Sequence, residues 1–492
     1  MLTGVEPSRR RELILGGGVF AGSLVLLLLR FLVPRPVGYS DNGDGWRLLC
    51  QVGANELGGP STDDFVRFLY QSGPDCSGVD YVASQVWFAK LGQWLGDLIG
   101  SDAALNLVLV GCVESAVAAA AVTAIVLGLR LSTRWRIVAA AVLLLVVADS
   151  AFFPFFASVA TEGAAFLGIT LTVGGLLLMG REGRWRYAGA VVTVFGGIVA
   201  ANAKAQAVLI LPLLVLALVF TRPNGVTGVR RWALPAVVAV IVSGVTGFLQ
   251  LSYSSEAPGA DTRVINAYHA VFHSIVDGQH DSAEDLAALG LPASYAKYQG
   301  TLYWGPVNAT QDPEWPKYRH LFSGRNLAEY YATHPQRTGQ ILNRAASDLL
   351  TMRQERQGNF SANTGFAPRA KEFRVPVVSG VLNLVSPLGI YLLAPLWLAI
   401  GWVAVRAWRG HRREIGVVLL MLLGVAVAQF LVGGLAEGIE NVKHQIIAAF
   451  ATALAIALAG LAFVRVPRKD GCPDPSVGHP SGSVGQTHAH SS

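Results

Sequence analysis

About ten apolar segments of roughly 20 residues each recur along the chain. A helix rises about 1.5 Å per residue, so each segment is long enough to cross a bilayer. Within hydrocarbon every backbone polar group has to be satisfied inside the chain, which leaves helices as the predicted form. The pair on either side of Lys204 is also compatible with a re-entrant hairpin. The predicted helices cover residues 12–34, 104–129, 137–154, 163–180, 187–203, 205–221, 232–251, 379–405, 415–433 and 444–464.

The composition agrees with a membrane protein. Hydrophobic residues make up 52% of the 492 residues and charged residues only 14%, too few to cover a soluble surface of that size. The net charge is +6, but the arginines lie in short clusters between apolar runs, so nucleic acid is not an expected partner. The apolar stretch 13–33 is longer than a signal-peptide core and lacks a small-residue cleavage site, so we expect a retained first helix.

Basic residues follow every second predicted helix, on the same side as the arginines at positions 9–11. Because positively charged loops stay in the cytoplasm, both termini are predicted to be cytoplasmic in a multi-pass protein of the plasma membrane. The basic clusters are Arg130, Arg134 and Arg136; Arg181, Arg184 and Arg186; Arg222, Arg230 and Arg231; Arg406, Arg409, Arg412 and Arg413; and Arg465, Arg468 and Lys469.

The chain divides into regions on this basis. Residues 1–251 form an N-terminal membrane module whose first exterior loop, 35–103, carries candidate catalytic residues. Residues 252–378 form an exterior, mostly helical loop subdomain. The last membrane helices lie in 379–469, and 470–492, rich in Gly, Ser, Pro and His, is predicted to be a disordered cytoplasmic tail. The predicted fold class is an all-α polytopic membrane protein.

The cysteines agree with this sidedness. Cys50 and Cys76 both lie in the first exterior loop, where the surroundings are oxidising. A disulfide between them would restrain the loop and contribute about 3 kcal/mol on chain-entropy grounds. Cys112 lies within a predicted helix and Cys472 in the tail.

Two carboxylates, Asp41 and Asp44, lie around a glycine turn a few residues after the first helix, with Arg47 close behind. Such carboxylates can serve as a general base, or as ligands for a divalent cation such as Mg²⁺ or Mn²⁺. Asp-Asn-Gly-Asp is equally a good tight turn. The residues alone leave both interpretations open.

A second polar group lies between the third and fourth helices. Asp149 and Glu162 flank an aromatic stretch, Phe152-Phe153-Pro154-Phe155-Phe156, of the kind found at membrane interfaces. Charged groups beside apolar segments are functional candidates in membrane proteins. Each of these carboxylates could also cap a helix end, where an acidic residue favours the N-terminus.

Cationic and amide side chains gather at two other exterior helix ends. Lys204 and Gln206 lie between the fifth and sixth helices, where Lys204 either snorkels to the surface or pairs with a lipid phosphate. Ahead of the last helix, Lys443 and His444 supply further donors for a phosphate, although His444 is equally an interfacial histidine. Two carboxylates, Glu437 and Glu440, precede them.

Base candidates and phosphate-binding candidates thus share one predicted face. No Walker A loop, G-x-S-x-G elbow or CxxC pair is present in the sequence. Because nucleoside triphosphates are not expected outside the cell, a reaction there needs a donor that is already activated and delivered by lipid. A polyprenyl-phosphate sugar meets that need.

These motifs, in this order, resemble those of GT-C-type glycosyltransferases, and within that group the bacterial glycan-biosynthesis hexose transferases of the WsfD type. The chain departs from the pattern at Gly45, where an aromatic residue is expected, and at Ala160-Thr161-Glu162-Gly163, where a sequence like Tyr-Ser-Glu-Pro is expected. The matching segments are Asp41-Asn-Gly-Asp44 with Arg47, the Asp149 to Glu162 link, Lys204-Ala-Gln206, Asn266-Ala-Tyr-His-Ala-Val-Phe272, Leu289-Gly-Leu-Pro292 and Lys443-His444.

The resemblance implies transfer of a hexose from a polyprenyl-phosphate donor to a cell-surface glycan or glycolipid on the exterior face. Asp41 or Asp44 would accept the proton of the acceptor hydroxyl, and Glu162 would orient the base or a metal. The donor and its phosphate would contact Arg47, Asp149, Lys204, Gln206, Glu440, Lys443 and His444. The acceptor would contact Tyr268, His269 and Trp304, with Trp315 also available, although such aromatics are often subdomain core.

Two other function classes compete with this interpretation. A transporter or flippase for a lipid-linked sugar predicts charges near the bilayer midplane and interrupted helices in paired halves. Glu114, inside the second helix, is a charge of that kind with no assigned role, and no inverted repeat is evident. A non-catalytic scaffold of a glycan-assembly complex would tolerate loss of the carboxylates.

Overall fold

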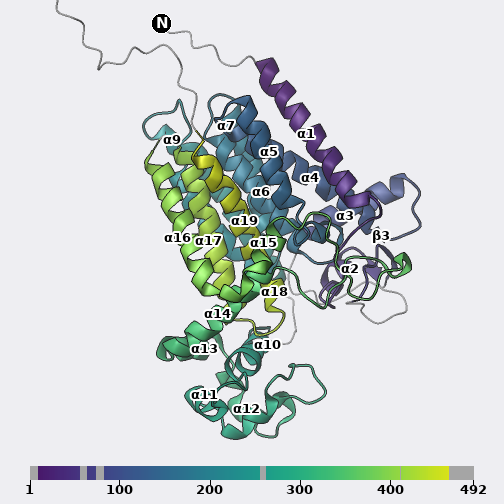
Figure 1. The fold of residues 1–492 in the computed structure, drawn as a ribbon, viewed down its shortest axis with the longest axis vertical. Coiled ribbons are helices and arrows are strands. Elements are labelled where there is room, and N and C mark those ends of the chain that lie inside the picture. Colours follow the sequence, from purple (N-terminus) through teal and green to yellow (C-terminus); the bar gives the residue numbers. More distant parts are fainter. Residues whose placement is uncertain (1–8, 56–63, 74–82, 255–261, 411, 465–492) are drawn as a thin grey trace, which may run out of the picture.

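The computed structural model describes residues 9–55, 64–73, 83–254, 262–410 and 412–464 (Figure 1). Long helices run side by side in one bundle, and a smaller helical body lies beyond one end of it. The helices long and apolar enough to span are α1 (Arg9–Leu32), α4 (Leu107–Gly128), α6 (Glu162–Met179), α9 (Arg230–Ser254), α16 (Ile390–Arg409) and α17 (Arg413–Leu435). Shorter apolar helices are α5 (Thr133–Val147), α7 (Trp185–Ala201), α8 (Ile210–Phe220) and α19 (Ile446–Ala462).

Every predicted segment contains a helix, and the prediction of an all-α polytopic membrane protein is confirmed. The single helix expected over 379–405 is wrong. That stretch divides into α15 (Val378–Leu384), η8 (Ser386–Leu388) and α16. Gly389 interrupts it with a φ of +50°, and a Cβ there would lie 2.4 Å from Asn343 Oδ1. The segment expected over 205–221 begins as the 3₁₀ turn η2 (Ala205–Leu209) before α8.

Helix α6 lies at the centre of the bundle, because all of its residues are buried. It packs closely on α7 through glycines. A Cβ on Gly168 would lie 2.3 Å from the backbone nitrogen of Ala200, and one on Gly189 would lie 2.3 Å from that of Met179. Small residues let membrane helices approach this closely, so the two backbones form one rigid unit.

The outer helices present apolar side chains to their surroundings. On α9, Val240 is 72% exposed, and on α16, Leu398 is 74% exposed. Exposing apolar surface of this extent to water is unfavourable, whereas lipid tails are as apolar as these side chains. The outward faces of α9 and α16 are therefore lipid-facing.

The loops at one end of the bundle form a small layer of their own. It contains a three-stranded antiparallel sheet, β1 (Ala54–Asn55), β2 (Leu69–Ser72) and β3 (Leu105–Asn106), in the order β1-β2-β3. Helices α2 (Trp46–Gln51), α3 (Gln85–Leu98), η1 (Phe153–Ala157) and η7 (Ala362–Thr364) complete it. A distant segment crosses this layer, since Gly38 N donates to Asn359 O and Ser40 N to Gly358 O.

The smaller body has a hydrophobic core separate from that of the bundle, built around buried side chains such as Tyr268, Phe272 and Tyr295. Its elements are α10 (Thr262–His269), the π-helical turn η3 (Ala270–Ile275), α11 (Ser282–Ala288), η4 (Ala293–Tyr298), η5 (Ala309–Gln311), α12 (Trp315–Tyr318), η6 (Arg319–Leu321), α13 (Gly324–Thr333) and α14 (Pro335–Thr351). Helix α14 belongs to both cores, with Ile341 in one and Leu349 in the other.

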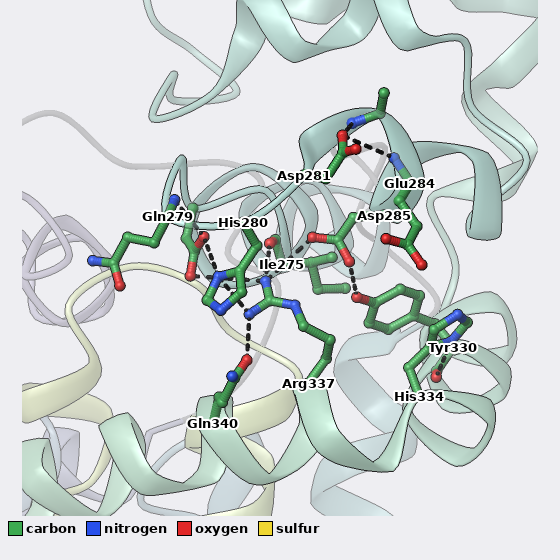
Figure 2. A network of polar contacts seen from close by, with 12 residues as sticks. Ile275, Gln279, His280, Asp281, Glu284, Asp285, Tyr330, His334, Arg337 and Gln340 are labelled. Atoms are coloured by element: carbon green, nitrogen blue, oxygen red, sulfur yellow. Dashed lines mark hydrogen bonds and ion pairs between the residues drawn. The ribbon is translucent and has the colours of Figure 1, made fainter.

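Within the smaller body, a polar network joins η3 and α11 to helix α14, as Figure 2 shows. Arg337 on α14 donates from Nη2 to Ile275 O at 2.7 Å and to Asp285 Oδ2 at 3.2 Å. Tyr330 on α13 donates its hydroxyl to Asp285 Oδ1. Because Arg337 and Asp285 are paired, the turn after η3 and helix α11 keep a fixed position on the end of the bundle.

Candidate functional site

The site begins with a tight turn that follows α1. Asp41 Oδ1 accepts hydrogen bonds from Gly43 N at 3.1 Å and from Gly45 N at 2.9 Å. Gly43 has a φ of +97°, which side-chain-bearing residues rarely adopt. Asp41 Oδ2 has no hydrogen-bond partner among the described residues. Asp41 therefore stabilises the tight turn through Oδ1 and is at the same time the candidate base through Oδ2.

Asp44 forms the centre of an ion-pair group. Its Oδ2 lies 2.6 Å from Lys443 Nζ, and its Oδ1 lies 3.2 Å from Arg47 Nη1. Glu440 lies 3.6 Å from the same Lys443 nitrogen and accepts from Asn42 Nδ2 at 2.5 Å. The Lys443 side chain is only 1% exposed, whereas that of Asp44 is 49% exposed, so the carboxylate faces outward and the ammonium inward. Lys443 and Glu440 come from α18 (Asn441–His444) and the residue before it.

A second ion-pair group lies at the start of α6. Glu162 Oε1 is 3.1 Å from Lys204 Nζ, which in turn lies 3.3 Å from His444 Nδ1. His444 Nδ1 also pairs with Glu437 Oε2 at 2.6 Å. Gln206 donates to His444 O at 3.2 Å, which places its chain segment against α18.

Lys443 joins the two groups. Burial acts to lower its pKa, but Asp44 and Glu162 raise it well above the ordinary value, so both carboxylates lie within electrostatic reach of one ammonium. Burial acts to raise the pKa of Asp44, and Lys443 and Lys204 together hold it below its usual range. We call these residues the carboxylate–lysine cluster: Asp41, Asp44, Arg47, Glu162, Lys204, Glu437, Glu440, Lys443 and His444.

The carboxylates in this cluster differ in proton affinity. Burial raises the pKa of Asp41 above 3.8, and the hydrogen bonds from Gly45 and Gly43 and the charge of Lys443 only partly oppose it. Asp44 is held ionised by its cationic neighbours. Neighbouring carboxylates whose pKa values are driven apart are the usual arrangement of acid–base sites. Asp41 therefore binds a proton more readily than Asp44.

Asp149 is not brought into the cluster. Its Oδ1 accepts from Ala151 N at 2.9 Å, and its Oδ2 accepts from Val378 N at 2.7 Å and Ser379 N at 3.1 Å. The carboxylate is fully buried and caps the start of α15. Asp149 is therefore a candidate donor-binding residue that lies in a different part of the layer, where backbone N–H groups hold its carboxylate.

The candidate acceptor residues separate into core and surface. Tyr268 is buried in the smaller body, where its hydroxyl contacts Thr301 Oγ1 at 2.6 Å, and Trp315 is 8% exposed. Trp304 is 63% exposed and meets the His269 ring edge-on at 4.9 Å. His269 in turn lies within electrostatic reach of Glu437 and His444. The structure therefore brings His269 and Trp304, but not Tyr268, to the edge of the cluster.

Cys50 is disulfide-bonded. Cys76 lies outside the described residues, so the pairing of Cys50 with Cys76 stays a prediction. Of the described cysteines, Cys112 in α4 is free.

Asp41 and Asp44 are the candidate ligands for a divalent cation. No group of three or more His, Cys, Asp or Glu side chains within the described ranges is placed to hold a metal ion. Asp44 pairs with Lys443 and Arg47, and Asp41 Oδ1 accepts from two backbone N–H groups. Asp41 Oδ2 has no partner among the described residues, and a divalent cation held by Asp41 and Asp44 stays a prediction.

Sequence reasoning gave no role to two residues near the site. Glu114 of α4 accepts from Gln85 Nε2 at 2.5 Å, and Gln85 Oε1 accepts from Ala164 N at 2.9 Å. Through Gln85, Glu114 therefore holds the first turn of α6, which carries Glu162. Asn42 links the turn to Glu440. Glu114 could have been singled out from the sequence, because a glutamate inside an apolar segment is unusual. Asn42 could not, because asparagine is common in turns.

Helices and site together define a polytopic all-α membrane protein with a charged cluster at one end of its bundle. Residues 8–472 match the model of the YfdI N-terminal transmembrane domain, so the chain belongs to that family. No curated protein sequence matches the chain.

Among solved structures, the Archaeoglobus fulgidus oligosaccharyltransferase, tethered with an acceptor peptide containing the NVT sequon via a disulfide bond, matches with a TM-score of 0.38 and 15% sequence identity. The match covers 89% of this chain and 49% of that chain, so this chain spans about half the length of the archaeal protein. Likeness of that degree defines neither a shared fold nor a shared activity.

Proposed function

We propose that this protein is a membrane glycosyltransferase of the GT-C type, which transfers a hexose from a polyprenyl-phosphate donor to a glycan or glycolipid acceptor outside the cell. The observation that carries the proposal is the convergence of separate sequence motifs. Residues 41–47, 162, 204–206 and 437–444 come from different helix ends and meet in one cluster of ion pairs. Base and cation are both present where the lipid surface would deliver a donor.

Asp41 is the proposed general base. Its Oδ2 has no partner among the described residues, and its raised pKa brings it closer to the working pH, which favours proton transfer. The acceptor oxygen would attack the anomeric carbon while the carbon–oxygen bond to the lipid phosphate breaks. The hydroxyl proton would pass to Asp41, and the lipid phosphate would leave with the bonding electrons.

Lys204 and Lys443 are the proposed neutralising cations for that phosphate. Each is held by a carboxylate, Lys204 by Glu162 and Lys443 by Asp44. An ammonium is a compact charge with rotatable donors, so it can turn from a carboxylate toward a phosphate that enters beside it. The glutamate and aspartate would keep the two lysines charged and in place before the donor arrives.

Trp304 is the proposed contact for the acceptor. It is exposed, its position is fixed by His269, and His269 lies within electrostatic reach of Glu437. An indole ring offers a flat apolar face against which a sugar ring can stack. Tyr268 and Trp315 are assigned to the core of the smaller body instead.

The experiment uses the purified chain with a polyprenyl-phosphate hexose and a set of glycan acceptors. D41N is expected to lower kcat by roughly 10²- to 10⁴-fold, as removal of a general base does. D64N is the control, because Asp64 is an exposed carboxylate on the same loop that pairs with Arg369. Wild-type transfer by both D41N and D44N would refute the proposed function, as would lipid-linked sugar movement across vesicles without transfer.

A further inference from the structure

A cluster of basic side chains lies at the loop end of α1, apart from the carboxylate–lysine cluster. Arg30 is in the last turn of α1, and Arg353 follows α14. Arg374 donates to Arg30 O at 2.9 Å and to Arg35 O at 2.8 Å, which brings its segment over the end of α1. The basic members are Arg30, Arg35, Arg353, Lys371 and Arg374, and the carboxylates within reach are Asp149, Glu355 and Glu372.

Arg30 has a donor that these carboxylates leave unused. Its Nε donates to Ala148 O at 3.2 Å and its Nη2 pairs with Glu372. The side chain is 6% exposed, yet Nη1 has no hydrogen-bond partner among the described residues. A buried guanidinium N–H without an acceptor is costly, so the position favours an acceptor that comes from outside the chain.

Arg353 and Ser379 leave further donors in the same neighbourhood. Arg353 Nη2 donates to Glu372 O at 2.6 Å, but its buried Nη1 has no partner in the described part of the chain. Ser379 N donates to Asp149 at 3.1 Å, and the buried Ser379 Oγ is likewise without one. Arg30 and Arg353 both contact Glu372, and Arg30 also donates to the carbonyl of Ala148, the residue before Asp149, so these groups lie around the same two carboxylates.

Neither Asp149 nor Glu372 accepts a hydrogen bond from Arg30 Nη1, Arg353 Nη1 or Ser379 Oγ. Asp149 accepts from the backbone nitrogens of Ala151, Val378 and Ser379. Glu372 accepts from Arg30 through Oε1 and from Arg374 N through Oε2 at 2.9 Å. Burial lowers the pKa of Lys371 to about 8, and the charge of the neighbouring Arg353 adds to that effect.

The surroundings of the cluster are apolar and exposed. Phe373 is 68% exposed and lies under the Arg353 guanidinium at 4.4 Å. Val377 is 45% exposed, and Val33, just after α1, is 55% exposed. Charged donors ringed by apolar side chains at the end of a spanning helix match the boundary between lipid headgroups and acyl chains.

We propose that Arg30 Nη1, Arg353 Nη1 and Ser379 Oγ bind a phosphate group, carried by a lipid headgroup of the adjoining leaflet or free in solution. Guanidinium groups match phosphate oxygens in geometry and charge, and a hydroxyl adds one more donor. The site is separate from the carboxylate–lysine cluster and does not depend on sugar transfer.

The test is calorimetric titration of the purified full-length chain in a neutral maltoside detergent. The probes are dioctanoyl phosphatidic acid, inorganic phosphate, and dioctanoylglycerol, which has the same acyl chains without phosphate. R353Q is expected to weaken binding of the phosphate probes about tenfold, the usual effect of losing one charged hydrogen-bond donor. R356Q is the matched control, because Arg356 is exposed on the same segment.

Loss of Arg30 alone would leave Glu372 buried without its partner, so R30Q is paired with E372Q, which keeps the site neutral. This double variant is also expected to bind about tenfold more weakly. Binding of phosphatidic acid alone assigns the site to a lipid, and binding of inorganic phosphate alone assigns it to the free ion. Equal binding of dioctanoylglycerol, unchanged binding by R353Q, or no binding of either phosphate probe overturns the proposal.

Discussion

At the scale of single residues, each lysine and histidine side chain in the carboxylate–lysine cluster contacts an acidic partner. Lys443 pairs with Asp44, Lys204 with Glu162 and His444 with Glu437. Buried charges are tolerated when paired in this way, and breaking one pair leaves the other charge uncompensated. The pairing keeps the lysines ionised, whereas Asp41 Oδ2 has no partner in the described part of the chain.

The first prediction concerns the pH dependence of transfer. Lys443 lowers the pKa of Asp41, so K443Q should raise that pKa further and move the acidic limb of the kcat/KM profile to higher pH. The carboxylate form is lost as pH falls through the folded pKa, so transfer declines earlier on acidification. K297Q, at an exposed lysine of the smaller body, should leave the profile unchanged. A K443Q limb at lower pH would contradict Asp41 as the base.

The second prediction concerns His269. Burial lowers its pKa to about 4, and His273 contributes. The neutral ring accepts from Tyr303 N at 3.1 Å, which a protonated ring cannot do. Since the unfolded group titrates near 6.5, stability is present above that pH and is lost as pH falls from 6.5 toward 4.

The loss should be at most about 3 kcal/mol, and it should be smaller in H269Q, whose amide oxygen can accept the same bond without titrating. Denaturant titrations of the detergent-solubilised chain between pH 7 and 4 measure it. Equal acid sensitivity in H269Q would show that His269 is not responsible.

At the scale of elements, the site depends on a close contact between the loop after α17 and helix α10. A Cβ on Gly438 would lie 1.9 Å from His269 O, so only glycine lets the loop after α17 reach α10. Two residues on, Glu440 has a φ of +52°, a strained value for a residue with a side chain. Both features bring Glu440 and Lys443 back toward the turn after α1.

The third prediction tests the packing of α6 on α7. G168A should destabilise the protein by about 1–3 kcal/mol, because the added methyl meets backbone atoms of Ala200 that cannot rotate away. G17A is the control on α1, where nothing lies within 4 Å of the added carbon. Thermal unfolding in detergent compares the two, and equal stability would show that the α6–α7 contact is looser than described.

Sequence patterns predicted the helices well because apolar periodicity and length are local properties. They missed the break at Gly389, which depends on Asn343 in another element. They placed Asp44 and Lys443 on the same face of the membrane. They did not predict the contact between the two residues, which are 399 positions apart. The hydrogen bonds from Val378 N and Ser379 N to Asp149 were not predictable, because every residue type except proline has a backbone N–H group.

At the scale of the whole molecule, the two ends of the bundle differ in charge chemistry. At the end opposite the site, several arginines share a small number of carboxylates. Arg136 and Arg181 both pair with Glu12, and Arg130 pairs with Glu414. These come from the basic connections that predict a cytoplasmic face. The orientation of the protein in the membrane follows from that rule and stays a prediction.

The fourth prediction tests this orientation by cysteine labelling in cells. In a chain with C112A and C472S, A283C on α11 should react with a membrane-impermeant maleimide, because that position is exposed on the smaller body. E182C, exposed in the turn between α6 and α7 at the other end, should react only after the cells are permeabilised. The reverse pattern would invert the topology.

The ion pair between Asp44 and Lys443 also has a consequence for biosynthesis. Its two members lie 399 residues apart, and α18 enters the chain just before the last described helix. The ribosome has therefore synthesised the chain as far as α18 before the pair can close. Nascent chains that have not yet reached α18 would carry an incomplete cluster, so the chemistry proposed here would begin only once Lys443 has been synthesised and inserted.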